Sequence, residues 1–125
     1  MNPAGGAMDE PLSMSVERRA GATVVALRGA STMEQSEEIR ARLLAVLEER
    51  PGVVVLDLSG LSFIESTGLG SIVAAHIRAR RAGAVIRMVN PTPAIRELLR
   101  TTRLTELFGV YSDVSAAVAA PVPAQ

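Results

Sequence analysis

The strongest constraint on the fold is the segment from Val53 to Leu58, an apolar run in which apolar and polar residues do not alternate. A strand with one face in water alternates, whereas a strand covered by helices on both faces is apolar nearly throughout. We therefore expect this strand at the centre of a sheet. Shortly after it, Ser66 and Thr67 stand immediately before a glycine that opens a helical pattern.

The chain before this strand predicts an antiparallel hairpin followed by a helix. Two β-type runs, Ser13 to Arg19 and Thr23 to Arg28, are separated by a glycine-containing turn. Apolar residues then recur at helical spacing from Glu34 to Arg50, and Pro51-Gly52 ends the pattern. The helix start offers two alternative capping-box pairs, Thr32 with Gln35 and Ser31 with Glu34.

The chain after the central strand predicts further alternation of helices and strands. We expect a turn at Ser59-Gly60, a connection from Leu61 to Glu65, a helix ending near Gly83, a strand from Ala84 to Val89, a helix from Pro93 to Thr101 with Thr92 as its N-cap, a short segment from Leu104 to Val110, and a final helix from Asp113 to Ala120. This order predicts an α/β domain: a mixed, mostly parallel sheet with an N-terminal antiparallel hairpin and helices packed against it. The domain is expected to span residues 12–120, between flexible tails at 1–11 and 121–125.

Composition excludes several classes of protein. Thirteen basic residues, all arginine, balance thirteen acidic ones, so no positive field favours direct binding of nucleic acid. The absence of lysine excludes a Schiff base and the lysine of a phosphate-binding P-loop. The absence of cysteine and the single histidine, His76, exclude zinc–thiolate and multi-histidine sites. We expect no metal and no cofactor.

The chain also lacks the marks of a membrane or exported protein. No apolar stretch approaches the roughly 20 residues that span a bilayer. The first residues contain neither a basic start nor the apolar core of a signal peptide. We therefore expect a cytoplasmic protein without membrane insertion.

The hydroxyls of Ser66 and Thr67 have two possible roles. A helix N-terminus carries unpaired N–H groups and partial positive charge, which suit an anion, including a phosphate attached to a side chain there. This makes the hydroxyls candidates for a modification switch. The simpler alternative is that they cap the helix.

The order of elements and the segment LDLSGLSFIESTGLG, Leu56 to Gly70, resemble the STAS domain, specifically the stand-alone bacterial anti-sigma factor antagonists. The resemblance covers about Ser13 to Ala120. In that family a strand ending in Asp-Leu-Ser precedes a phenylalanine-containing loop and then Asp-Ser-Ser-Gly-Leu-Gly. The direct matches are Phe63, Gly68, Leu69 and Gly70, while Glu65 takes the acidic position and Ser66 that of the phosphorylated serine.

The resemblance implies a partner switch and no enzymatic activity. The unmodified antagonist binds an anti-sigma factor with serine kinase activity, phosphorylation by that kinase ends the binding, and a serine phosphatase restores it. Ser66 is the expected phosphorylation site, with Thr67 as a secondary candidate. The expected partner-binding residues are Phe63, Glu65, Ser66, Thr67, Gly68, Leu69 and Ser71. No catalytic residue and no oligomeric state are predicted.

The chain departs from the family pattern after its second strand. The family commonly has Gly-Glu-Leu/Ile-Asp, whereas this chain has Gly-Ala-Ser-Thr, so acidic residues are missing at Ala30 and Thr32. Thr32 and Asp57 are possible supporting residues. Asp57 is expected chiefly to bond the backbone near Ser59, although it could also assist chemistry near Ser66.

Two other functions compete with the switch. The missing acids favour a non-phosphorylated STAS scaffold or an accessory subunit of a signalling or transporter complex. An enzyme using Ser66 and His76 has the least support, because no base is paired with a nucleophile and a lone histidine on an apolar stripe usually packs. Near the end of the second helix, Arg78, Arg80 and Arg81 either complement the helix dipole or form a partner-facing patch.

Overall fold

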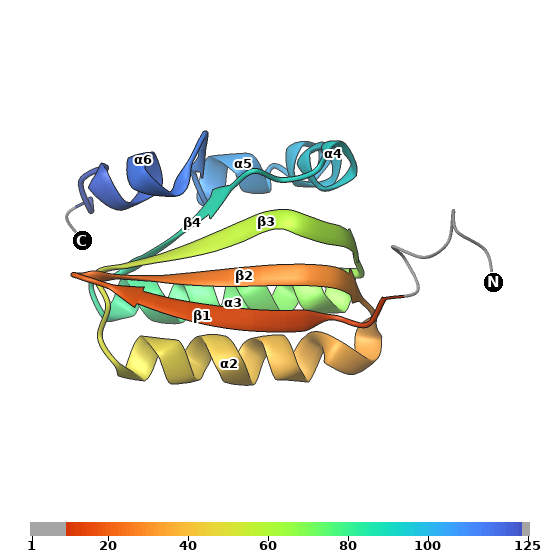
Figure 1. The fold of residues 1–125 in the computed structure, drawn as a ribbon, viewed down its shortest axis with the longest axis horizontal. Helices are drawn as coiled ribbons and strands as arrows, with labels where there is room; N and C mark the ends of the chain where they lie inside the picture. Colours follow the sequence, from red (N-terminus) through yellow and green to blue (C-terminus); the bar gives the residue numbers. More distant parts are fainter. Residues whose placement is uncertain (1–9, 124–125) are drawn as a thin grey trace.

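The computed structural model describes residues 10–123, which form one five-stranded sheet with helices on both faces (Figure 1). The strands are β1 (Ser13–Arg19), β2 (Ala22–Ser31), β3 (Val53–Ile64), β4 (Val85–Val89) and β5 (Val110–Tyr111). The helical segments are η2 (Met33–Gln35), α2 (Ser36–Glu48), α3 (Ser66–Arg81), α4 (Pro93–Thr101), α5 (Leu104–Leu107) and α6 (Val114–Ala119). The strand order is β1-β2-β3-β4-β5, with β1 and β2 antiparallel and the other pairs parallel. The predicted fold class is confirmed.

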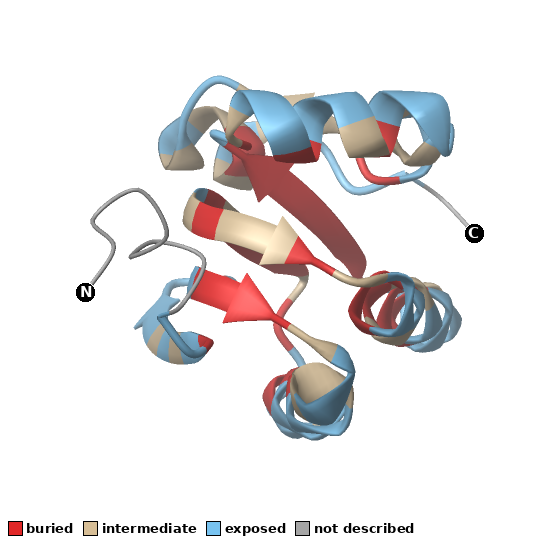
Figure 2. Cartoon of the chain, turned by 90° about the vertical axis from the view of Figure 1, so that its right-hand side faces the viewer, coloured by how far each residue is buried: buried red, intermediate tan, exposed pale blue. Residues whose placement is uncertain are grey.

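The central position of β3 explains the nearly continuous apolar run from Val53 to Leu58, which Asp57 alone interrupts. Val54 and Leu56 belong to the core cluster on the side of α2 and α3, while Val53 and Val55 belong to a second cluster that includes Ala117 of α6. Alternate residues of one strand therefore face two different helix layers. Figure 2 shows these buried strands between the two layers, whose outer surfaces are exposed.

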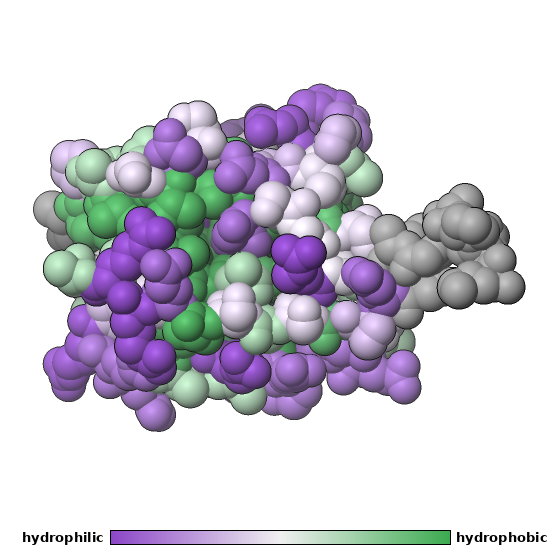
Figure 3. Space-filling view, in the orientation of Figure 1, coloured by the Kyte–Doolittle hydropathy of each residue, from purple (hydrophilic) through white to green (hydrophobic). Residues whose placement is uncertain are grey.

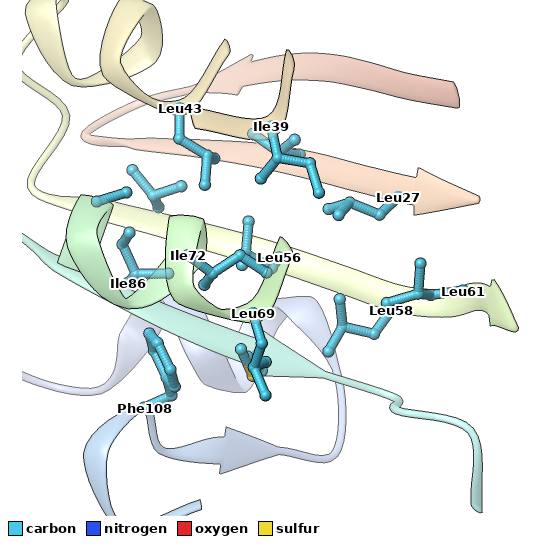
Figure 4. Packing of buried hydrophobic residues seen from close by; sticks show 14 of the residues in the cluster. Leu27, Ile39, Leu43, Leu56, Leu58, Leu61, Leu69, Ile72, Ile86 and Phe108 are labelled. Atoms are coloured by element: carbon cyan, nitrogen blue, oxygen red, sulfur yellow. The ribbon is translucent and has the colours of Figure 1, made fainter. Parts of the chain in front are cut away.

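The larger cluster holds α2 and α3 against the sheet. Figure 4 shows Leu43 of α2 and Ile72 of α3 packed toward Leu56 and Ile86 of the central strands, with Phe108 closing one side. All five side chains are almost fully buried. Removing water from one such side chain stabilises the fold by about 1.5–3 kcal/mol. This packing holds α2 and α3 on the same face of the sheet.

The turn predicted at Ser59-Gly60 is wrong, because β3 continues to Ile64. Its pairing with β2 shifts register twice, so that Arg28 lies opposite Gly60 and Ala30 opposite Phe63. The extra residues form β-bulges, which interrupt the ladder without ending the strand. Asp57 accepts a hydrogen bond from the Ser59 N–H at 3.1 Å, as predicted, but within a strand. A Cβ on Gly60 would lie 2.9 Å from Arg28 Cγ, so the close pairing requires glycine there.

The capping-box pair Thr32 with Gln35 is confirmed. Gln35 Oε1 accepts hydrogen bonds from the Thr32 N–H at 2.8 Å and from the Thr32 hydroxyl at 2.5 Å. The alternative pair is absent from the described residues, because the Ser31 hydroxyl is buried without a hydrogen-bond partner. The capped segment is the short 3₁₀ helix η2, so α2 begins at Ser36, two residues later than predicted.

Residues at both ends of the described chain form hydrogen bonds with the sheet. The Ala30 N–H donates to the Glu10 carbonyl at 2.9 Å, so backbone pairing begins before the boundary predicted after Pro11. Arg87 of β4 donates to the carbonyls of Ala120 and Pro121. The rest of the predicted tails, residues 1–9 and 124–125, lies outside the described residues. No helix within residues 10–123 has the length and apolar character to cross a membrane.

Candidate functional site

The first turn of α3 stands where β2 and β3 both end (Figure 1). The Glu65 N–H donates to the Ser31 carbonyl at 2.9 Å and so ties the start of α3 to the end of β2. Glu65 is the N-cap residue, with extended backbone angles of φ −81° and ψ 164°, and Ser66 is the first helical residue. The N-terminus of α3 therefore faces solvent beside the connection between β2 and η2.

The hydroxyls of Ser66 and Thr67 are exposed at this N-terminus. Within residues 10–123, neither hydroxyl makes a hydrogen bond, and Glu65 rather than either of them occupies the N-cap position. The capping role considered for these residues is thus not formed, because they lie one and two residues past the cap. Both hydroxyls are accessible to another protein.

The Glu65 carboxylate is fixed across the site. Its Oε2 accepts a hydrogen bond from the backbone N–H of Met33 at 2.6 Å. A negative charge is thereby held at the first turn of η2, directly after Thr32, one of the positions where the family's acidic residues are missing. Thr32 itself lies at the site, and its hydroxyl is occupied by Gln35.

Met33 is a feature of the site that the sequence analysis missed. The residue is 63% exposed, the most exposed of the large hydrophobic residues within residues 10–123. Its backbone N–H is the group bound by Glu65, so this exposed residue lies next to the Glu65 carboxylate. The sequence could have indicated this role, because Met33 is apolar but lies outside the apolar stripe of the helix that follows it.

The predicted partner-binding residues divide into exposed and packing positions. Ser66 and Thr67 are exposed, and Phe63 and Glu65 are partly exposed. Leu69 is only 8% exposed and belongs to the core. The packing positions are Gly68, Leu69 and Ser71, which lie beneath the exposed residues.

Gly68 and Ser71 hold α3 against its neighbours. A Cβ at Gly68 would lie 2.9 Å from Ser31 Oγ and 3.0 Å from Ile64 Cγ1, so a glycine is needed where α3 crosses β2 and β3. The Ser71 hydroxyl donates to the Ser36 carbonyl at 2.9 Å and links α3 to α2. Ser71, one of the expected partner-binding residues, therefore forms a contact between helices.

Asp57 does not lie beside Ser66. It belongs to the first half of β3, and seven residues of extended chain to Ile64 correspond to roughly 20 Å. Its carboxylate bonds the Ser59 N–H. The suggestion that it assists chemistry near Ser66 has no geometric support.

His76 is a packing residue, as predicted. It is buried on α3 with its ring edge-on to Phe108, the ring centroids being 4.9 Å apart. Burial, and then the nearby charge of Arg80, lower the pKa of His76 below its usual value, so the ring is neutral at pH 7. His76 lies ten residues along α3 from Ser66, about 15 Å away, too far to act on it as a base.

Metal binding also lacks a geometric basis in the part of the chain that the structure describes. Residues 10–123 contain no group of three or more His, Cys, Asp or Glu side chains that could hold an ion.

The fold is an α/β domain with a mixed five-stranded sheet and exposed hydroxyls at the start of the helix that follows its central strand. The chain belongs to the STAS domain family, whose model matches residues 13–117. The match includes the whole sheet and the first turn of α3.

Two relatives are similar over most of their lengths. A Bordetella bronchiseptica protein named as a candidate anti-sigma factor antagonist, BtrV, is 25% identical over 109 residues, 87% of this chain and 94% of its own. The anti-sigma F factor antagonist of Paenibacillus polymyxa is 24% identical over 103 residues, 82% of this chain and 88% of its own.

Solved structures share the fold. The crystal structure of an anti-sigma factor antagonist from Mycobacterium paratuberculosis has a TM-score of 0.77 at 26% identity, covering 86% of this chain and 91% of that one. The Bacillus cell fate determinant SpoIIAA in its phosphorylated form has a TM-score of 0.66 at 19% identity, covering 83% and 96%. A sulfate transporter family protein from Wolinella succinogenes has a TM-score of 0.69 at 18% identity, covering 82% and 86%. The last two similarities show the fold alone.

Proposed function

We propose that this protein is an anti-sigma factor antagonist that acts in the cytoplasm and is released from its anti-sigma factor when Ser66 is phosphorylated. The names of the relatives support the partner class. The observation that carries the regulatory part is the exposed Ser66 hydroxyl at the N-terminus of α3, with no hydrogen bond to any residue in 10–123. The chain is then the substrate of a kinase and not itself an enzyme.

The N-terminus of α3 is a suitable place for a phosphate. A phosphoserine adds about −1.5 to −2 charge and three acceptor oxygens at neutral pH. The unpaired N–H groups and partial positive charge of the first helical turn interact favourably with that charge. Phosphorylation at Ser66 is therefore compatible with the folded domain.

The partner bears most of the effect. A surface packed closely on Ser66 meets new bulk and new charge beside the Glu65 carboxylate, which is already held at Met33. Unpaired like charges in an interface cost several kcal/mol through repulsion and desolvation. A loss of this size is enough to dissociate a complex of modest affinity.

Phosphorylation by the partner tests the proposal directly. The protein is incubated with ATP and a candidate anti-sigma factor kinase from the same genome, and phosphate is located by mass spectrometry. We expect one phosphate on Ser66, none on the Ser66→Ala variant, and normal modification of Ser115→Ala, a control at another exposed serine. Treatment of the phosphorylated protein with a serine phosphatase should then restore its binding to the anti-sigma factor. Phosphate on Thr67 alone, or no phosphate with any such kinase, contradicts the regulatory part.

One observation favours a second function, a non-phosphorylated scaffold or accessory subunit. The positions of the missing family acids, Ala30 and Thr32, hold a buried methyl group and a hydroxyl committed to Gln35. The fold is also found in a sulfate transporter family protein. This function predicts a partner that binds wild type and Ser66→Asp with equal affinity.

A further inference from the structure

A groove lies between the C-terminal halves of α2 and α3, at the opposite end of these helices from Ser66. Its volume is about 620 Å³. Leu44, Leu47 and Glu48 of α2 line it on one side, Arg78 of α3 on the other, and the connections at 50–52 and 82–84 close its end.

The groove continues along the seam between the two helices. A second hollow of about 150 Å³ shares Leu44 and Arg78 with the first and extends past Ala74, Ala75 and Ile77. The two hollows together form an elongated surface, which we call the α2/α3 groove. Its elongated shape differs from that of a small, closed pocket that would bind a metabolite.

The rim of the α2/α3 groove is basic. Arg50, Arg78 and Arg81 line it, and none of the three forms an ion pair with another residue in 10–123. Arg40 also lines it, paired with Glu37, and Glu48 is the one acidic residue among the lining residues. The unpaired cations suit a negatively charged occupant.

The floor of the α2/α3 groove is apolar. Leu44 and Leu47 are partly or largely buried there, and small alanine side chains leave room above them. Ile77 lies at the edge of the groove and is 49% exposed. A hydrophobic groove is one of the surfaces that bind the apolar face of an amphipathic helix.

We propose that the α2/α3 groove binds an acidic amphipathic helix of a partner protein, with apolar side chains on Leu44 and Ile77 and carboxylates on Arg50, Arg78 and Arg81. Charge complementarity favours an acidic segment, and the elongated apolar floor favours a helix over a free anion. This surface is separate from the proposed switch, because Ser66 and Arg78 are about 18 Å apart along α3. One molecule can therefore engage two partners.

A display selection tests this binding. A library of random 16-residue peptides is selected against the full-length protein, and the enriched peptides are measured by fluorescence polarisation. We expect peptides with net negative charge and apolar residues at helical spacing. Their affinity should fall at least about tenfold on Arg78→Glu and weaken with added salt.

Matched variants locate the site. Arg96→Glu is the control, because Arg96 is an exposed arginine of α4 without an ion pair in the described chain. It should leave peptide binding unchanged, as should Ser66→Asp, whose behaviour tests only the switch. Equal binding of all enriched peptides by wild type and Arg78→Glu overturns the proposal, and so does enrichment of neutral or basic peptides.

Two further measurements test other occupants. Co-sedimentation with vesicles containing anionic phosphatidylglycerol, lost in Arg78→Glu, would identify a lipid surface instead. Self-association in analytical ultracentrifugation that Arg78→Glu abolishes would identify a second copy of the chain instead. The proposal expects neither.

Discussion

The C-terminal helix α6 depends on a buried arginine, and replacing Arg87 should destabilise the fold. Arg87 is 5% exposed in β4, and its guanidinium donates to the carbonyls of Ala117 at 2.8 Å, Ala120 at 2.6 Å and Pro121 at 2.5 Å. Proline has no N–H, so Pro121 cannot bond the Ala117 carbonyl as a continuing helix would. Arg87 supplies the missing donor and a positive charge at the helix C-terminus.

The expected loss of unfolding free energy in Arg87→Met follows from two opposing contributions. Burying the guanidinium costs several kcal/mol, which methionine recovers. Against this, hydrogen bonds from a charged donor contribute about 1.5–3 kcal/mol each, and three are lost. Only the bond to Ala117 is buried, so the other two carbonyls regain water. We expect a net loss of about 2–3 kcal/mol, or roughly 10 °C in Tm for a chain of this size.

Urea denaturation followed by circular dichroism measures this loss. Arg87→Lys keeps the charge but replaces the planar guanidinium with a compact ammonium group. We therefore expect its stability to lie between those of the wild type and Arg87→Met. Arg96→Met, on the exposed face of α4, should change the free energy of unfolding by less than about 0.5 kcal/mol. If Arg87→Met is as stable as the wild type, the desolvation cost cancels the hydrogen bonds and the stabilising role of Arg87 is refuted.

Two further predictions concern α3. Gly68→Ala should destabilise the protein by about 1–3 kcal/mol, because its Cβ would meet Ser31 Oγ at 2.9 Å, and adding Ser31→Ala should recover part of the loss; equal stability of wild type and Gly68→Ala in urea contradicts this contact. The lowered pKa of His76 means that the unfolded chain binds a proton more readily, so stability present above about pH 6.5 should fall as the pH drops through the folded-state pKa. His76→Gln should reduce this fall in a pH series of unfolding curves, and an identical pH dependence would exclude His76 as its source.

Local patterns in the sequence were enough to predict much of the fold. The nearly continuous apolar run from Val53 to Leu58 predicted the central strand, because a strand covered on both faces shows no regular alternation of apolar and polar residues. The Thr92 cap is confirmed, with its hydroxyl accepting from the Ile95 N–H at 3.4 Å. The final helix, predicted from Asp113, begins one residue later, and Asp113 is its N-cap, accepting from the Ala116 N–H at 2.8 Å. Such caps involve neighbours in the chain, and so sequence spacing reveals them.

The features that sequence reasoning missed depend on contacts between distant residues. The extension of β3 past Gly60 is imposed by pairing with β2, which overrides a local turn signal. The N-cap of α3 moves to Glu65 because its carboxylate and N–H are both bound by the β2–η2 segment. The hydrogen bonds of Arg87 join residues that are about thirty positions apart in the sequence. No periodicity encodes these contacts.

The most direct test of the proposed switch compares the affinity of the anti-sigma factor for two forms of this protein. Unmodified protein and protein phosphorylated at Ser66 are titrated with the same partner by isothermal calorimetry, and their unfolding is measured in parallel. We predict at least about a hundredfold weaker binding on phosphorylation, or about 2.7 kcal/mol, with nearly unchanged stability of the domain. Equal affinities of the two forms, or a loss of binding that follows unfolding of the domain, would contradict a switch acting at the partner's surface.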